Sequence, residues 1–195
     1  REIGAEEFQR RGRVLAVEKV QTIAGLFQRE LEDSLLTLIQ AKWLVNQSSN
    51  FRLKLYGSGW ENDLNLKNFQ EAPLKLFSEA YRRVILQSKI MLYSSLMIKN
   101  GSYMQPDLIN GIAGGGFFLV NGCLVDTVGE KVLEPFAGLL ETYRNREELL
   151  EKTAYFLKNE TERREKAGRL QEHILRNFGI DRVAKVIFEA YREIV

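Results

Sequence analysis

Short apolar runs with strand character alternate with helix-like segments from residue 52 onward. The runs lie at residues 52–56, 90–96 and 117–120, with a further candidate strand at 139–143. Helical periodicity covers residues 76–88 and 106–113, and three more helical segments finish the chain at 146–158, 160–177 and 180–194. Strands that alternate with helices at this spacing form parallel βαβ units. The sequence therefore predicts an α/β fold, a parallel sheet flanked by helices.

Residues 1–47 form a predicted helical arm ahead of this sheet. Leu31, Leu35 and Leu38 belong to an apolar series with three- and four-residue spacing, although residues 14–17 suit a short strand equally well. An amphipathic helix needs a partner surface, which is either the rest of this domain or a missing one. Residues 17–45 are thus a candidate docking segment for another protein. The polar stretch at 47–50 marks a boundary, so we expect two parts, 1–47 and 48–195.

The charge balance and the residue counts exclude several classes of function. The 28 basic and 26 acidic residues leave a net charge of only +2, and no basic stripe is interleaved with aromatic residues, so nucleic acid is not an expected partner. A single cysteine, Cys123, excludes an internal disulfide and a CxxC zinc site. We therefore expect neither a protein-bound metal nor a cofactor.

The chain also lacks recognisable membrane and export signals. No apolar run approaches the ~20 residues of a transmembrane helix, and no signal-peptide pattern is present, so we expect no transmembrane segment and a cytoplasmic protein. Because the sequence begins at Arg1, we interpret it as a piece of a longer protein.

Three charged positions have an ordinary structural interpretation. The only histidine, His173, lies in a charged helical stretch and is predicted to be solvated. Arg163 and Arg164 are predicted to lie on a solvated helical face.

Three glycine-containing segments are candidates for ligand binding. Ligands of open parallel sheets bind beyond the carboxyl ends of the strands, and we expect all three segments there. The first, Tyr56–Trp60, contains two glycines that allow close backbone approach and an indole that suits stacking. The second, residues 100–103, leads into the helix at Pro106, whose free N–H groups suit a diphosphate, although Asp107 competes for that helix end. The third is Gly114–Phe117, where a triple glycine permits close approach of a ligand or tight packing.

The order of these segments resembles the C-terminal domain of group 1 glycosyltransferases. Tyr56–Trp60 is similar to the family's YGxGW segment, and residues 81–90 and 110–117 resemble its helix-to-strand junctions. Residues 147–164 are similar to its EELLEK…YL…ER tail, and the likeness is closest to the spore-maturation CgeB-like branch. The resemblance covers about residues 50–190.

The resemblance implies one Rossmann-like half of a GT-B fold. Such a domain holds a nucleotide-diphosphate sugar, while a preceding N-terminal domain of the same protein holds the acceptor, here unknown. The donor's diphosphate is then stabilised by backbone amides, a helix N-terminus and basic side chains. The predicted substrate-binding residues are Tyr56, Gly57, Ser58, Gly59, Trp60, Lys89, Gly101, Ser102, Asn110, Gly114 and Gly115.

The sequence departs from the family pattern at two acidic positions. The carboxylate that typically holds the nucleotide ribose falls on Asn110, and a second glutamate common in relatives falls on Ser102. An amide hydrogen-bonds a hydroxyl without the strength that a charge adds. The alternative hypothesis is therefore a catalytically degenerate GT-B-like domain that acts as a protein-interaction module. An unrelated α/β regulatory domain would explain the helices but not the ordered motifs.

Overall fold

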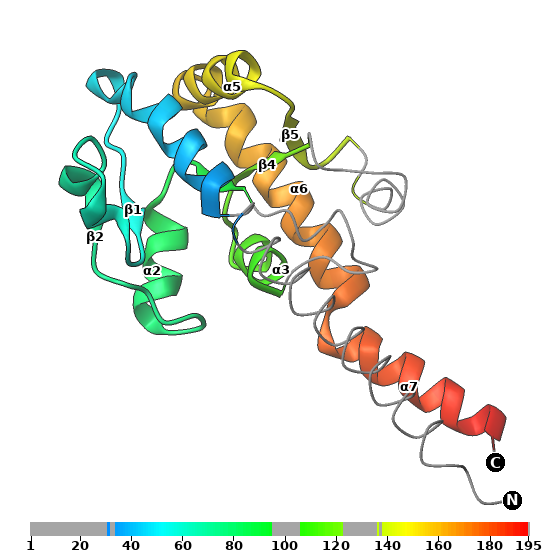
Figure 1. The fold of residues 1–195 in the computed structure, drawn as a ribbon. Helices are drawn as coiled ribbons and strands as arrows, with labels where there is room; N and C mark the ends of the chain where they lie inside the picture. Colours follow the sequence, from blue (N-terminus) through cyan, green and yellow to red (C-terminus); the bar gives the residue numbers. More distant parts are fainter. Residues whose placement is uncertain (1–30, 32–33, 95–105, 123–135, 137, 195) are drawn as a thin grey trace, which may run out of the picture.

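The computed structural model describes residues 31, 34–94, 106–122, 136 and 138–194 (Figure 1). The predicted residues Gly101 and Ser102 lie outside this set, as do residues 14–17 and most of the expected arm. No helix within the described ranges is both long and apolar enough to cross a membrane.

Two parallel sheets confirm the predicted α/β architecture. Strands β3 (Met91–Tyr93), β4 (Phe118–Asn121) and β5 (Glu141–Tyr143) form one sheet in sequence order, and β1 (Leu55–Tyr56) pairs with β2 (Gln70–Glu71) in the other. The first strand is shorter than the predicted 52–56, and β2 was not predicted. Gln70 and Glu71 carry no apolar pattern, so pairing with β1, rather than local sequence, makes them a strand.

The described helices follow the predicted segments closely. α3 (Pro106–Ala113), α5 (Arg146–Lys158) and α7 (Ile180–Ile194) match, and α6 (Glu160–Phe178) is one residue longer than predicted. α2 (Glu79–Gln87) begins later than residue 76 because the Ser78 side chain caps it, accepting a hydrogen bond from the Tyr81 N–H at 3.2 Å. Single-turn 3-10 helices lie at Ser48–Asn50, Trp60–Asn62 and Lys67–Phe69.

Both faces of the three-stranded sheet are covered by apolar clusters. Phe118 and Val120 of β4 face α3 and the C-terminal half of α6, where Leu170 and Ile174 are buried. Alternate residues of β4 face the other way, where Leu119 packs with residues of α5 and the first half of α6. α6 therefore packs against both faces of the sheet. α7 follows α6 and extends away from the rest of the described domain (Figure 1).

The described part of the N-terminal segment packs on this domain. Residues 34–45 are helical, and Ala41 and Leu44 are buried in the domain's apolar clusters. Two polar contacts fix the same helix, from Thr37 Oγ1 to Ser94 Oγ at 2.6 Å and from the Tyr143 hydroxyl to Gln40 Oε1 at 2.7 Å. For residues 34–45, the partner surface that the amphipathic pattern requires is thus the rest of this domain.

Two predictions of solvated helical residues are wrong. Arg163 is 5% exposed, and its guanidinium donates to the Phe156 carbonyl, whereas Arg164 is exposed as predicted and pairs with Glu160 at 2.6 Å. His173 is half-buried, with its ring edge-on to Phe136 at 5.3 Å. Helical periodicity locates a residue on its own helix but does not reveal which distant segment returns to cover it.

Candidate functional site

The carboxyl ends of β3, β4 and β5 form the edge at which an open parallel sheet is expected to bind ligands. The register pairs Tyr93 with Val120 and Asn121 with Tyr143, so Ser94, Asn121 and Tyr143 stand in one row across the three strand ends. Residues in register on neighbouring strands point to the same face. The row therefore presents its side chains together.

Side chains of this row form hydrogen bonds with the helix at residues 34–45. Ser94 and Tyr143 bond to Thr37 and Gln40 of that helix, and Asn121, 3% exposed, lies between them in the row. Gln40 is itself 1% exposed, so these polar groups satisfy one another inside the fold. A ligand at this edge would meet strand-end backbone rather than these side chains.

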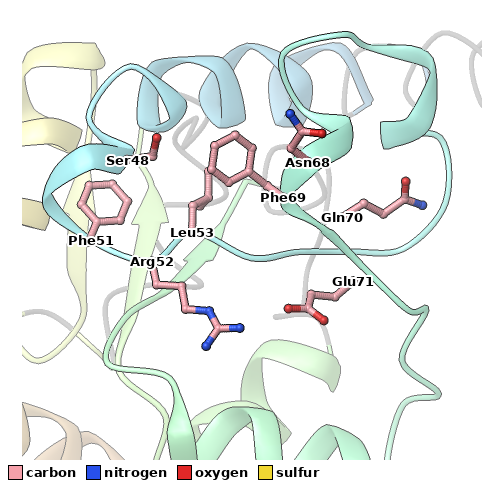
Figure 2. Close-up of a pocket in the computed structure, with 8 residues that line it drawn as sticks. All are labelled: Ser48, Phe51, Arg52, Leu53, Asn68, Phe69, Gln70 and Glu71. Carbon is pink, nitrogen blue, oxygen red and sulfur yellow. The ribbon is translucent and has the colours of Figure 1, made fainter.

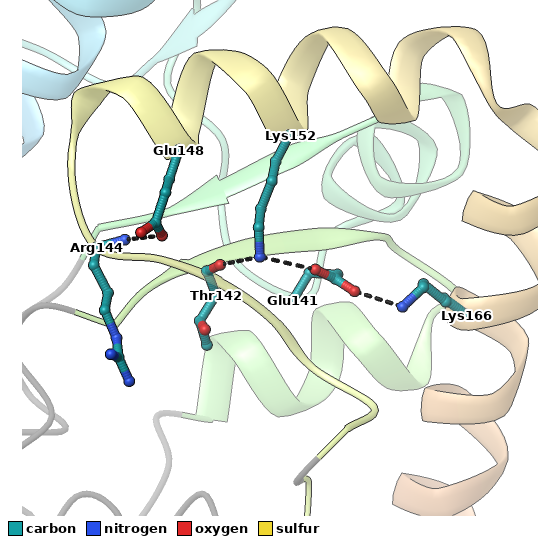
Figure 3. A network of polar contacts seen from close by, with 6 residues as sticks. All are labelled: Glu141, Thr142, Arg144, Glu148, Lys152 and Lys166. Atoms are coloured by element: carbon teal, nitrogen blue, oxygen red, sulfur yellow. Dashed lines mark hydrogen bonds and ion pairs between the residues drawn. The ribbon is translucent and has the colours of Figure 1, made fainter.

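The N-terminus of α5, which follows β5, is capped by side chains of its own segment. Asn145 Oδ1 accepts from the Glu148 N–H at 2.8 Å. Glu148 Oε2 in turn accepts from the Arg144 N–H at 2.9 Å (Figure 3). This arrangement resembles a capping box, and it places two carboxylates, Glu147 and Glu148, in the first turn. Their negative charge disfavours a phosphate at this helix end.

The α3 N-terminus carries Asp107 in its first turn. The Oδ1 atom of that carboxylate is buried without a hydrogen-bond partner, and the Tyr81 hydroxyl donates to the Asp107 carbonyl at 3.2 Å. Burial, together with the negative charge of Asp107, raises the pKa of Tyr81. A diphosphate placed directly on this helix end would meet the same charge.

The loop Tyr56–Trp60 follows β1 and is stabilised by its own hydrogen bonds. Gly57 and Gly59 have φ of 119° and 95°, which side chains with a Cβ rarely adopt. The Trp60 indole donates to the Tyr56 carbonyl at 3.2 Å and packs on the apolar cluster below the loop. Ser58 is exposed at the loop tip, so it is the side chain of this segment most accessible to a ligand.

The carboxylate of Glu61 also stabilises this loop. It accepts from the Gly59 N–H at 2.8 Å and from Gln70 Nε2 at 3.0 Å. Backbone hydrogen bonding at Glu61 itself, followed by the bonds from Gln70 and Gly59, lowers the pKa of Glu61. Gln70 also donates to the Gly57 carbonyl at 3.2 Å, so β2 supports the loop from the side.

The triple-glycine segment lies at the opposite edge of the sheet from the one predicted. It connects α3 to the amino end of β4, and the expectation that it stands at the carboxyl ends is wrong. The Gly115 N–H bonds to the Ile112 carbonyl at 2.8 Å and the Gly116 N–H to the Gly111 carbonyl at 3.0 Å, with φ of 86° at Gly115. These two bonds form a Schellman motif that ends α3.

Tight packing accounts for the neighbouring glycines as well. A Cβ at Gly116 would lie 2.8 Å from the Phe118 ring and 3.1 Å from Ile85 Cγ2, and one at Gly111 would collide with the same ring. The glycines thus let α3 and the following turn close onto Phe118. In a parallel sheet, a loop that leads from a helix into a strand lies at the amino edge. The predicted order of helix and strand was therefore sufficient to place the triple glycine at that edge.

The remaining predicted residues are separated in space. Lys89 is exposed two residues before β3, at the amino edge. Asn110 is exposed on α3, one turn after Asp107. Of the predicted residues that the structure describes, only the Tyr56–Trp60 loop follows the carboxyl end of a strand, β1 of the two-stranded sheet.

An ion-pair network at the amino end of β5 was not predicted. Lys166 of α6 lies 2.5 Å from Glu141 Oε1, and Lys152 of α5 lies 3.2 Å from Glu141 Oε2 and 2.6 Å from the Thr142 carbonyl (Figure 3). Burial alone would raise the pKa of Glu141, but the two lysines outweigh it and the pKa is lowered. The described residues contain no cluster of histidine, cysteine or carboxylate groups able to hold a metal ion.

A hollow of about 320 Å³ lies between residues 48–53 and 68–71 (Figure 2). Residues 48–53 precede β1, and residues 68–71 include β2, so the hollow lies beside the two-stranded sheet. Gln70, one of its lining residues, also donates to the Gly57 carbonyl of the Tyr56–Trp60 loop. Glu71 pairs with Lys54 at 2.9 Å, and that hydrogen bond lowers the pKa of Glu71. The positive charge of Arg52 lowers the pKa of Glu71 further.

Comparison with known proteins identifies the chain's family. A search of curated proteins and a search of solved structures each found no match. A family model described as glycosyl transferase-like matches residues 35–189, which begin inside the N-terminal helix and include both parallel sheets and the helices up to α7. The chain therefore belongs to the glycosyl transferase-like family.

Proposed function

We propose that this chain is the donor half of a GT-B glycosyltransferase, the domain that holds a nucleotide-diphosphate sugar. The observation that carries the proposal is the family match over residues 35–189, because it covers every described strand of a parallel sheet. The acceptor would come from a preceding domain of the same protein, and the expected compartment is the cytoplasm.

The proposed donor site is the carboxyl edge of the strands. It includes the Tyr56–Trp60 loop, with Ser58 at its tip, and the segment predicted at Gly101 and Ser102. In the transfer, an acceptor hydroxyl oxygen bonds to the anomeric carbon as that carbon's bond to the diphosphate oxygen breaks, and the hydroxyl proton leaves to a base. Backbone N–H groups stabilise the charge that develops on the departing diphosphate. Lys89, Gly114 and Gly115 lie at the amino edge, outside the proposed donor site.

Thermal unfolding in the presence of UDP-, GDP- and CDP-sugars tests the proposal. A ligand at 100 times its Kd stabilises the folded state by about 2.7 kcal/mol, which raises the Tm of a domain this size by roughly 5–10 °C. We expect such a shift with one nucleotide class, and we expect Gly57→Val to abolish it because valine does not adopt a φ of 119°.

Gly138→Val is the matched control. Gly138 also has a positive φ, 75°, with nothing within 4 Å of an added Cβ, but it precedes β5 at the amino edge. Its valine variant should lose stability through the same kind of strain yet keep the nucleotide shift. No shift with any nucleotide sugar, in protein that includes the preceding domain, would reject donor binding.

The interaction-module alternative has support from the surface. Phe188 and Tyr191 on α7 are 64% and 63% exposed, and Leu31 and Leu35 at the N-terminal helix are 66% and 57% exposed. Asn110 and the closed α5 N-terminus also reduce the number of groups expected to contact a donor. This alternative predicts no response to nucleotides, so the same thermal experiment separates the two functions.

A further inference from the structure

The turn that leads into α2 carries an exposed aromatic ring on a strained backbone. Leu76 and Phe77 are its two central residues, and the Ser78 N–H closes the turn by donating to the Lys75 carbonyl at 3.1 Å. Phe77 has a φ of 63°, a left-handed value that turns ordinarily give to glycine or asparagine. Its side chain is nevertheless 66% exposed. Because neither burial nor backbone preference accounts for a phenyl group there, the ring is a candidate contact for a partner outside the domain.

The exposed face of α2 follows directly after this turn. Leu86 follows Arg82 and Arg83 at spacings of four and three residues, so the three side chains share one face of the helix. All three are exposed, Leu86 by 63%, whereas Ile85 on the inner side is buried. Together with the turn residues Lys75, Leu76 and Phe77, they form what we call the α2 patch. α2 and the turn before it lie at the margin of the described domain (Figure 1).

The charge of this segment is concentrated and positive. Residues 75–89 contain four basic residues and one acidic residue, so they carry more positive charge than the net +2 of the whole chain. The acidic residue, Glu79, lies 4.0 Å from Arg82, and their side chains are 68% and 72% exposed. An ion pair this long and this exposed neutralises little charge, because water screens it. The partner that complements the α2 patch is therefore anionic.

We propose that the α2 patch binds an anionic lipid surface, with Leu76 and Phe77 among the headgroups and the basic side chains on the lipid phosphates. Leucine and aromatic side chains combined with basic ones are typical of segments that lie on a membrane surface. Each basic residue close to anionic lipid adds to the attraction. This role goes beyond the proposed function and does not rest on donor binding.

The exposure of the apolar side chains favours lipid over an acidic protein as the partner. Phe77 and Leu86 are each more than half exposed, so they project from the surface rather than line a groove. A fluid headgroup layer adapts to projecting side chains, whereas a protein partner needs a surface of complementary shape. The cytoplasmic leaflet of a membrane is also its anionic side, which suits the proposed compartment.

Co-sedimentation of the protein with lipid vesicles tests the proposal. We expect binding to vesicles of equimolar phosphatidylcholine and phosphatidylglycerol, weaker binding as the salt concentration rises, and little binding to phosphatidylcholine alone. The double variant Arg82→Gln and Arg83→Gln should bind the anionic vesicles about tenfold or more weakly. Phe77→Gly should bind them about fivefold or more weakly, because it removes the apolar contact. Glycine readily adopts a φ of 63°, so this variant should be at least as stable as the wild type, which urea unfolding checks.

Two variants outside the α2 patch are the matched controls. The double variant Arg164→Gln and Arg169→Gln removes the same charge from α6, where these side chains are 77% and 66% exposed. Leu64→Gly removes an apolar side chain that is 78% exposed in another turn. Both should bind the anionic vesicles within about twofold of the wild type, since long-range charge effects are screened by salt.

Several results would overturn the proposal. They are the absence of binding to anionic vesicles, equal binding to phosphatidylcholine alone, full binding by Phe77→Gly, and equal losses in the α2 and α6 double variants. Binding of poly-L-glutamate without binding of vesicles would assign the α2 patch to an acidic protein partner instead.

Discussion

Replacing Gly111 by alanine is expected to destabilise the domain by about 1–3 kcal/mol, the usual cost of forcing extra atoms into a packed core. Alanine in a helix interior is ordinarily more stable than glycine by roughly 0.5–1 kcal/mol, so the expected sign is reversed here. An added Cβ at Gly111 would lie 2.9 Å from Phe118 Cε2 and nearer still to Cζ. Phe118 is 5% exposed in the core, so its ring has little freedom to retreat. Urea denaturation monitored by circular dichroism measures the effect.

Two further variants control this experiment. Gly168 lies within α6 with nothing within 4 Å of an added Cβ, so Gly168→Ala should stabilise the protein by about 0.5–1 kcal/mol. Combining Gly111→Ala with Phe118→Leu should cost less than the sum of the two single changes, because the smaller side chain relieves the collision. If Gly111→Ala stabilised the protein as Gly168→Ala does, the close packing of α3 on β4 would be wrong.

Glu141→Gln is expected to destabilise the domain by about 1–3 kcal/mol at pH 7. The change leaves Lys152 and Lys166, both partly buried, without the carboxylate that they share. The expected loss of stability is smaller than for a fully buried ion pair, because both lysines remain partly exposed to water. The pKa of Glu141 is lowered in the folded state, so its contribution is complete above the unfolded-state pKa. It is lost as the pH falls below about 4.5 and through the folded-state pKa.

Urea unfolding at a series of pH values measures this contribution. The stability difference between the wild-type protein and Glu141→Gln should shrink as the pH falls below about 4.5. Glu165→Gln is the matched control, since Glu165 pairs with Arg169 on α6 at 2.5 Å but is 56% exposed. It should change stability by less than about 0.5 kcal/mol at any pH. A constant Glu141→Gln difference from pH 7 down to pH 3 would contradict the ion-pair account.

The helices were predictable because their signals are local. Asn145 and Ser78 cap α5 and α2, and their amphipathic patterns continue to within a few residues of the observed ends. The strand β2 was not predictable, because only its pairing with β1 defines it. The burial of Arg163 and His173 depends on Phe156 and Phe136, whose positions no local pattern gives.

The candidate site was less predictable than the fold for a physical reason. A glycine that leaves room for a ligand cannot be distinguished in the sequence from a glycine that leaves room for a neighbouring side chain. At Gly111 and Gly116 the atom nearest to an added Cβ belongs to Phe118, a residue close in sequence but on the next strand. The place of Gly57 and Gly59 after a strand was predicted, whereas their positive φ and the hydrogen bonds of Glu61 and Gln70 with that loop became evident only in the fold.

Hydrogen–deuterium exchange, with and without the nucleotide sugar that raises the Tm most, tests the central claim most directly. The proposed donor site predicts slower exchange at residues 56–60 and at the strand end around 121–122. It predicts no change at residues 114–116, which end α3 at the amino edge. Protection confined to the amino edge, or none anywhere despite a saturating nucleotide sugar, would contradict the assignment of this domain as a donor-binding half.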